Sequence, residues 1–155
     1  MKTAFFLLIS MFATAVTASV DLVKVDKSER QMFLLDDGKV VKTYAGGSPE
    51  GHKQQEGDER TPEGLYTLDY KKEDSSYYRS MHISYPNQKD IQKAESLGVS
   101  PGGFIMIHGQ RNRLGALDFL MQRFDWTDGC IAITNQEMDE FMELVSVGTK
   151  IQIEW

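Results

Sequence analysis

Cys130 and His108 are the two residues of this chain whose types and order could support nucleophilic chemistry. Cys130 is the only cysteine, and His108 follows the apolar run Phe104–Ile107. A thiolate is a strong nucleophile, and an imidazole with a pKa near about 6.5 can accept the proton of a thiol. The pair therefore predicts a cysteine nucleophile with a histidine general base. The alternative is structural, because lone cysteines and histidines beside apolar runs are more often packing residues.

Both candidates are expected where buried strands meet turns. Phe104–Ile107 has the length and apolar character of a strand buried on both faces, and Gly109 behind His108 permits a turn. The segment 127–130 predicts a tight turn that leads into the apolar strand 131–133. Strand ends hold side chains rigidly at the rim of a sheet, so the two candidates could meet there.

The glycine before the cysteine suits a catalytic turn. Gly129 would let the backbone approach a substrate closely, and the backbone amides of Gly129 and Cys130 are candidate oxyanion donors. We expect no metal and no cofactor, because three scattered histidines and one cysteine lack the local spacing of a zinc site.

The first 18 residues have the features of a secretory signal peptide. Lys2 precedes the apolar run 4–16, and small residues lead to an expected cleavage after Ala18. The run is too short to be a convincing membrane span. We therefore predict a periplasmic protein with one mature domain over 19–155. An exported protein usually pairs its cysteines, so the single Cys130 is a candidate reactive thiol.

The composition is that of a soluble globular domain. The chain is 26% charged and 41% hydrophobic, and its formal net charge is −6. This charge argues against bulk binding to nucleic acid or to anionic membranes. The mature length suffices for one domain with a real core and is too short for two.

The hydrophobic pattern predicts a mainly β domain with a few helices, an α+β fold. Strands are expected over 21–27, 31–35, 39–44, 65–70, 80–85 and 151–155, with a hairpin turn at Asp36-Asp37-Gly38 and a solvated loop over 71–76. Helices are expected over 87–97, capped by Gly98, over 114–124, and from the capping box Thr134–Glu137 to Gly148.

The glycine-rich loop Gly46–Gly64 is long for a compact domain, and such loops are usually functional or disordered. We predict that it borders the site. His52 in this loop could then face Cys130 and orient substrate or His108, although a plain surface histidine is the alternative. A backbone carbonyl, a serine or His52 could each orient the imidazole of His108. For His82 we predict a structural role on its strand.

Several blocks of the sequence carry a family resemblance. A His-Gly pair is followed downstream by Thr-Asp-Gly-Cys, and further blocks are GHKQQEGDERTPEG (51–64), HISYPN (82–87), PGGFIMIHG (101–109) and DWTDGCIAITNQEMDEF (125–141). In this order they resemble the L,D-transpeptidase catalytic domain of bacterial cell-wall enzymes, the YkuD-type fold, and its YafK-like branch in particular. The resemblance covers nearly the whole mature chain. It implies a β-sandwich or sheet domain with helices beside the strands that carry the site.

The resemblance implies an enzyme of peptidoglycan metabolism. Cys130 would attack stem peptides at diaminopimelate and form a thioester, with His108 as base. An amine acceptor makes the enzyme a transpeptidase, and water makes it a hydrolase. The YafK-like branch is associated with cleaving the bond between peptidoglycan and its attached lipoprotein, so the hydrolase is a serious alternative. A non-catalytic wall-binding module and a periplasmic metal carrier are the other classes.

Further positions are candidates for substrate binding. Guanidinium groups hold carboxylates well, and stem peptides end in carboxylates. The candidate residues are His52, Gly109, Arg111, Arg113, Trp126, Thr127 and Asp128.

Three departures from the broad family matter. Asp128 stands where many members have His, Ala132 stands where they have Arg, and the segment after Tyr44 is shorter. The first two differences predict a different handling of substrate. The third affects the length of the strand that ends near Tyr44 and the placement of the loop after it. A catalytic Cys130 is also expected to have a lowered pKa and to label rapidly, in dependence on His108.

Overall fold

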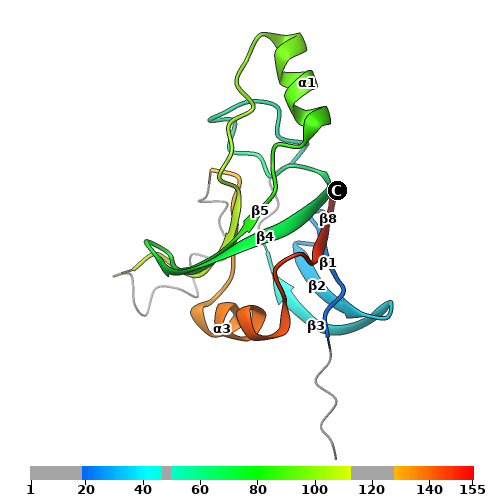
Figure 1. The fold of residues 1–155 in the computed structure, drawn as a ribbon, viewed down its shortest axis with the longest axis vertical. Coiled ribbons are helices and arrows are strands. Elements are labelled where there is room, and N and C mark those ends of the chain that lie inside the picture. The colour runs from blue at the N-terminus through cyan, green and yellow to red at the C-terminus, as the bar shows by residue number, and fades with distance from the viewer. Residues whose placement is uncertain (1–18, 47–49, 113–127) are drawn as a thin grey trace, which may run out of the picture.

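The computed structural model describes residues 19–46, 50–112 and 128–155 (Figure 1). Within these ranges the domain is mainly β, as predicted, with two helices beside eight strands. The elements are β1 (Leu22–Asp26), β2 (Gln31–Asp36), β3 (Lys39–Ala45), β4 (Gly64–Ser75), β5 (Tyr78–Ile83), α1 (Gln88–Leu97), β6 (Met106–His108), β7 (Ile131–Ala132), α3 (Asn135–Leu144) and β8 (Lys150–Glu154).

The long strand β4 joins two halves of the sheet, whose order is β3-β2-β1-β8-β4-β5-β6-β7. Its first residues, Gly64–Thr67, pair with β8, and from Leu68 onward it pairs with β5. The pairs β1–β8 and β6–β7 are parallel, and the remaining pairs are antiparallel. Figure 1 shows β4 in green between the two halves, with α1 and α3 at opposite ends of the molecule.

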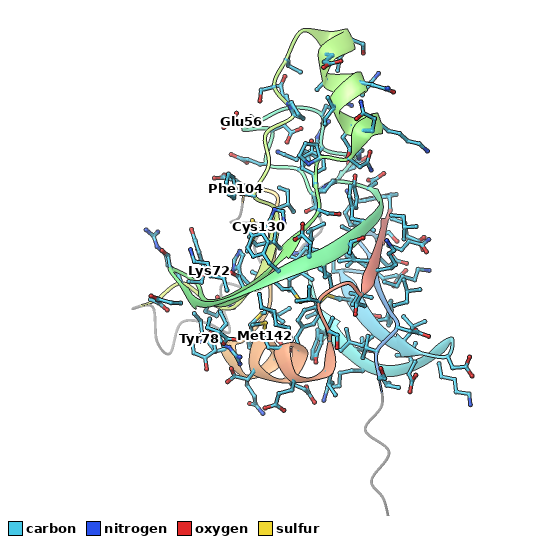
Figure 2. The ribbon with its side chains drawn as sticks, viewed as in Figure 1. Glu56, Lys72, Tyr78, Phe104, Cys130 and Met142 are labelled. Carbon is cyan, nitrogen blue, oxygen red and sulfur yellow. The ribbon has the colours of Figure 1, made fainter. Side chains whose placement is uncertain are left out.

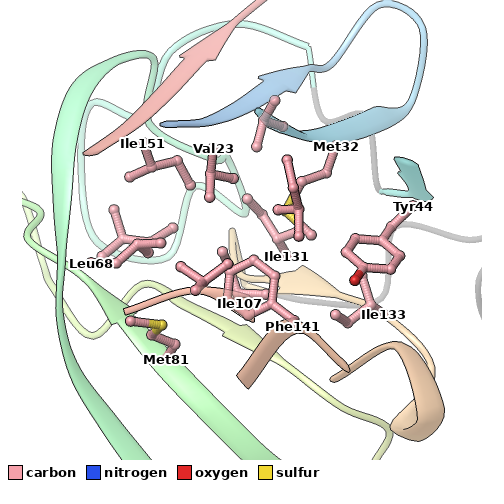
Figure 3. Packing of buried hydrophobic residues seen from close by; sticks show 14 of the residues in the cluster. Val23, Met32, Tyr44, Leu68, Met81, Ile107, Ile131, Ile133, Phe141 and Ile151 are labelled. Atoms are coloured by element: carbon pink, nitrogen blue, oxygen red, sulfur yellow. The ribbon is translucent and has the colours of Figure 1, made fainter. Parts of the chain in front are cut away.

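The core lies between the two halves of the sheet and is closed by α3 (Figure 3). Alternate residues of β1, β2 and β8 point into it, which is the expected pattern for strands with one face buried. Fully buried members from both halves and from α3 are Val23, Met32, Leu68, Met81, Ile107, Phe141 and Ile151. Burial of each such side chain stabilises the fold by roughly 1.5–3 kcal/mol.

Helix α3 begins as its sequence predicts. The side chain of Thr134 accepts from the backbone N–H of Glu137, and the Glu137 carboxylate accepts from the backbone N–H of Thr134, 2.8 Å away. The helix ends at Leu144, however, not at Gly148. Gly148 has φ +97° and lies in the turn before β8, because Val145 already leaves the helical conformation.

The helix over 87–97 is also confirmed. Asn87 caps α1 by accepting from the backbone of Lys89 and Asp90, and Gly98 closes it in the left-handed conformation. The strands expected before residue 70 are all present, and the turn at 36–38 joins β2 to β3. Val23 and Val25 alternate inward on β1, and Ile151 and Ile153 do so on β8.

Two predictions about strand bounds were wrong. Residues 71–75 belong to β4 and are not a loop, because Lys71 and Lys72 pair with Met81 and Ser80 of β5 while their polar ends reach solvent or α3. The apolar run at 104–107 enters strand β6 only at Met106. Phe104 has φ 56° and is exposed, so it cannot continue a strand.

The predicted signal peptide and the predicted helix over 114–124 lie outside the described residues. In the described part of the chain, none of the helices is long and apolar enough to cross a membrane.

Candidate active site

The parallel pairing of β6 and β7 sets the positions of the two predicted catalytic residues. Ile107 is opposite Ile131, and both point into the core. Because side chains alternate along a strand, His108 and Cys130 point to the other face. The backbone N–H of Met106 lies 3.4 Å from the Cys130 sulfur, which holds the thiol against β6. The sheet therefore brings both residues to one face.

The imidazole of His108 is buried and oriented by a backbone carbonyl. Only 4% of the residue is exposed, and Nδ1 lies 2.6 Å from the carbonyl oxygen of Gly109. A carbonyl oxygen can only accept, so Nδ1 carries the proton and Nε2 presents its lone pair. The ring centre of Tyr77 lies 4.6 Å from that of the imidazole. A backbone carbonyl, one of the predicted orienting groups, is therefore a partner of the imidazole.

Burial favours the neutral form of both residues. It lowers the pKa of His108 below its ordinary value of 6.5. It also raises the pKa of the Cys130 thiol above 9.0, the Asp128 carboxylate raises it further, and the N–H of Met106 and the Lys53 ammonium act in the opposite direction. The direction of the Cys130 shift is therefore opposite to the expected lowering. Burial thus favours a thiol at Cys130 and a neutral imidazole at His108.

Two pockets meet at Cys130. The first, of about 200 Å³, is lined by both predicted catalytic residues and by Ser75, Tyr77, Ser80, Phe104, Met106 and Asp128. We call it the His108 pocket. The second, of about 470 Å³, is lined by Lys53, Glu56, Gly57, Gly102, Gly103, Phe104, Asp128 and Cys130. We call it the Lys53 pocket. Figure 2 shows Phe104 and Glu56 on the same side of Cys130.

The glycine-rich loop borders this site, as predicted, in its described part 50–63. Lys53 is 3% exposed, and its ammonium is 2.8 Å from the Asp58 carboxylate, which also accepts from three backbone N–H groups of the loop. Burial by itself would raise the pKa of Asp58, but these bonds together lower it to about 2. The carboxylate thus stays charged and holds the loop, with Lys53, at the pocket.

The same loop explains Gly129. A Cβ atom there would lie 2.2 Å from the carbonyl oxygen of Arg60, and φ is +94°. The close approach that requires glycine is therefore to the chain's own loop. The proposed use of the Gly129 and Cys130 amides as oxyanion donors stays a prediction.

His52 lies away from Cys130. Its Nδ1 accepts from the backbone N–H of Glu63 at 2.8 Å, and its Nε2 is 3.4 Å from Asp90 of α1. It lines a separate pocket at the start of α1 and neither of the two pockets at the cysteine. The expectation that His52 faces the site is not met by this geometry.

The other predicted substrate residues differ in where they lie. Asp128 lines both pockets. At Gly109 a Cβ atom would lie 2.7 Å from the Asn135 side chain. This close contact, and not a turn, explains why the position is occupied by glycine. Arg111 is exposed and lines neither pocket. Arg113, Trp126 and Thr127 lie outside the described residues.

Side chains of helix α3 form hydrogen bonds with two segments that border the site. The side chain of Asn135 accepts from the backbone N–H of Gln110, 2.8 Å away, just after His108. Asp139 accepts from the Tyr78 hydroxyl and from Arg79, each at 2.8 Å, which holds the β4–β5 hairpin. Helix α3 therefore holds the segment just after His108 and the strand β5.

Sequence reasoning missed several lining residues. Lys53, Tyr77 and Ser80 give no local signal, because each joins the site only through sheet or loop pairing. Among the described residues, no group of three or more His, Cys, Asp or Glu side chains could hold a metal ion.

Comparisons of the sequence with known proteins give two kinds of match. The model of the YkuD family, described as the L,D-transpeptidase catalytic domain, matches residues 21–153. The YafK protein of Escherichia coli (strain K12) is 34% identical over 122 residues, which are 77% of this chain and 41% of YafK.

Solved structures share the fold. A mutant of the helical cell shape determining protein Pgp2 from Campylobacter jejuni superposes with a TM-score of 0.62 at 27% identity, over 87% of this chain and 47% of that one. A mutant of the Enterococcus faecium L,D-transpeptidase gives 0.57 at 17% identity, over 88% and 50% of the two chains. The match thus covers 41% of YafK and about half of Pgp2.

Proposed function

Because this chain belongs to the L,D-transpeptidase catalytic-domain family, we propose that it is an exported cysteine acyltransferase acting on peptidoglycan stem peptides. Cys130 is the nucleophile and His108 the general base. The observation that carries the proposal is that both side chains line one small pocket, on the face of the sheet opposite the core.

The direction of the two pKa shifts bears on how the thiol is activated. His108 Nε2 takes the Sγ proton as the sulfur attacks the carbonyl carbon of diaminopimelate, because burial raises the pKa of the thiol and favours its protonated form before the attack. The negative charge moves to the carbonyl oxygen, where the amides of Gly129 and Cys130 stabilise it. The C–N bond then breaks, His108 returns the proton to the leaving amine, and a thioester remains.

Proton exchange with His108 assigns roles to the two pockets. The leaving amine takes its proton from His108, and the incoming acceptor gives one back, so both occupy the pocket that contains the imidazole. The rest of the acyl donor then lies in the Lys53 pocket, which does not contain His108. An amine acceptor yields a new cross-link or an exchanged residue, and water releases the free acid.

Hydrolysis that releases lipoprotein is the second candidate. Among the described residues that line the His108 pocket, Asp128 is acidic and none is a lysine or arginine. A terminal amino acid would bring a carboxylate that finds no cationic partner among these residues. The lining therefore favours an amine that has no carboxylate beside it. A lipoprotein attached through a side-chain amine fits that description.

The test is to incubate the purified mature chain with sacculi that carry bound lipoprotein and to analyse released protein and muropeptides by mass. Lipoprotein release by the wild type, and not by Cys130→Ala, would establish the hydrolase. New cross-links or exchanged terminal residues would establish the transpeptidase. With neither product, the enzyme proposal fails in favour of a wall-binding module, and stoichiometric zinc in the purified protein would indicate a metal carrier.

A further inference from the structure

Three aromatic rings form a row on the surface beside the site. The ring centres of Tyr70 and His82 are 4.5 Å apart with planes at 13°, and those of His82 and Phe104 are 6.4 Å apart with planes at 68°. Tyr70 is 41% exposed and Phe104 is 81% exposed. These three residues come from β4, from β5 and from the segment before β6.

The register of the sheet places this row on the same face as the nucleophile. Tyr70 pairs with His82, and His82 pairs with Met106. Paired residues of neighbouring strands point to the same face. Met106 lines the His108 pocket with Cys130, and Phe104 lines both pockets. The row therefore runs from the mouth of the site outward across β5 to β4.

The chain sustains unfavourable features to present these rings. Phe104 combines a φ of 56° with an 81% exposed ring, and each of these is costly for a bulky apolar residue. In β4, Leu68 pairs with Ile83 and Tyr70 with His82, so Asp69 is one extra residue. Such bulges re-aim side chains and are frequent beside functional sites. Strain and exposure at one place indicate a ligand.

The bulge also brings a carboxylate to the rings. Asp69 Oδ1 is 2.7 Å from His82 Nδ1, and the Asp69 side chain is 40% exposed. A carboxylate can accept several hydrogen bonds, so Asp69 can both fix the His82 ring and accept from a ligand. Flat apolar ring faces beside an exposed acceptor suit a pyranose, which has a C–H face and a rim of hydroxyl groups.

We infer that Tyr70, His82 and Phe104, with Asp69, form a saccharide-binding platform for the glycan strand of peptidoglycan. The identity of this ligand rests on the proposed function, since the stem peptide processed at Cys130 hangs from that strand. The reach is consistent with it. Each extended residue of a stem peptide spans up to about 3.5 Å, so a few residues cover the length of the row between the site mouth and Tyr70.

Binding to glycan alone tests the platform without turnover. The probe is glycan strands stripped of stem peptides by amidase, and the protein is the full mature chain with Cys130→Ala. Adding Tyr70→Ser or Phe104→Asn should weaken binding about 3- to 10-fold, whereas Phe104→Tyr should retain it. Asn tolerates the left-handed backbone, so Phe104→Asn removes the ring without adding strain. Leu97→Ser, at a 49% exposed position on α1, is the matched surface control.

Turnover provides a second readout. We expect Tyr70→Ser to reduce the ratio of kcat/KM between glycan-linked and sugar-free stem peptide about tenfold. Asp69→Asn should reduce the same ratio and serves if Tyr70→Ser does not fold. An unchanged ratio, or stripped glycan binding that is absent or equal in all variants, would overturn the platform. Glycan binding with no turnover of either substrate would instead count against the proposed enzyme alone.

Discussion

His108 and His52 are held in opposite tautomers by the backbone groups beside them. The Nδ1 of His108 faces the carbonyl oxygen of Gly109, so it donates and leaves Nε2 as an acceptor. The Nδ1 of His52 faces the N–H of Glu63, so it accepts, and in the neutral ring Nε2 carries the proton toward Asp90. His108 thereby presents the acceptor nitrogen that the proposed base requires, while His52 ties a loop to a helix.

The difference shows that the residue type alone does not assign the role. Both histidines follow or precede a glycine and lie in blocks that resemble the same family. Their roles differ because one ring sits at a strand end under Tyr77 and the other in the glycine-rich loop against α1. Substitutions at the two positions should therefore separate catalysis from loop anchoring.

The largest effect is expected at the site itself. Cys130→Ala should abolish thioester formation, and His108→Gln should slow acylation about 10²–10⁴-fold because the thiol loses its proton acceptor. Acylation by a stem-peptide donor, followed by intact-protein mass, measures this loss. Both variants should retain the wild-type melting behaviour within a few degrees. Rapid acylation of His108→Gln would contradict the assignment of the base.

Gly129→Ala should produce the next largest effect, on stability. The new Cβ would meet the Arg60 carbonyl at 2.2 Å at a φ of +94°, so the free energy of unfolding should fall by about 1–3 kcal/mol. Denaturant unfolding provides the measurement. Gly103→Ala is the control, since its Cβ would have no neighbour closer than 4.0 Å. Equal stabilities of the two variants would show that the loop does not press on the turn.

His52→Ala should have a smaller, structural effect. It removes the acceptor for the Glu63 N–H and the contact with Asp90, so unfolding should become easier by about 1–2 kcal/mol. The rate of acylation should change less than about threefold, as for residues outside a site. A loss as large as that of His108→Gln would place His52 in the catalytic machinery and end the contrast between the two histidines.

The smallest effect concerns the charge beside the thiol. The Asp128 carboxylate raises the pKa of Cys130 and the Lys53 ammonium lowers it. Asp128→Asn should therefore move the alkaline rise of thiol alkylation to lower pH, and Lys53→Met should move it to higher pH. The rate of iodoacetamide labelling against pH tests the signs. Shifts in the same direction for both variants would show that these charges do not act on the thiol as the geometry indicates.

Much of the fold could be predicted because local patterns agree with it. The alternation of Val23 with Val25, the Thr134 capping box and the Gly98 cap each encode an element within a few residues. The family resemblance was confirmed by the match over 21–153. The 71–75 segment was missed because polar residues form strand when a partner, here β5, supplies their backbone hydrogen bonds.

The sequence by itself determined the chemistry available to this protein: one thiol, an imidazole after an apolar run, and glycines around both. Tertiary structure alone decided how that chemistry is arranged. The β6–β7 register brings Cys130 and His108 to one pocket, and burial sets the direction of both pKa shifts. The loop brings Lys53 to the thiol and turns His52 away from it. These outcomes depend on contacts between residues distant in the chain, which no local pattern records.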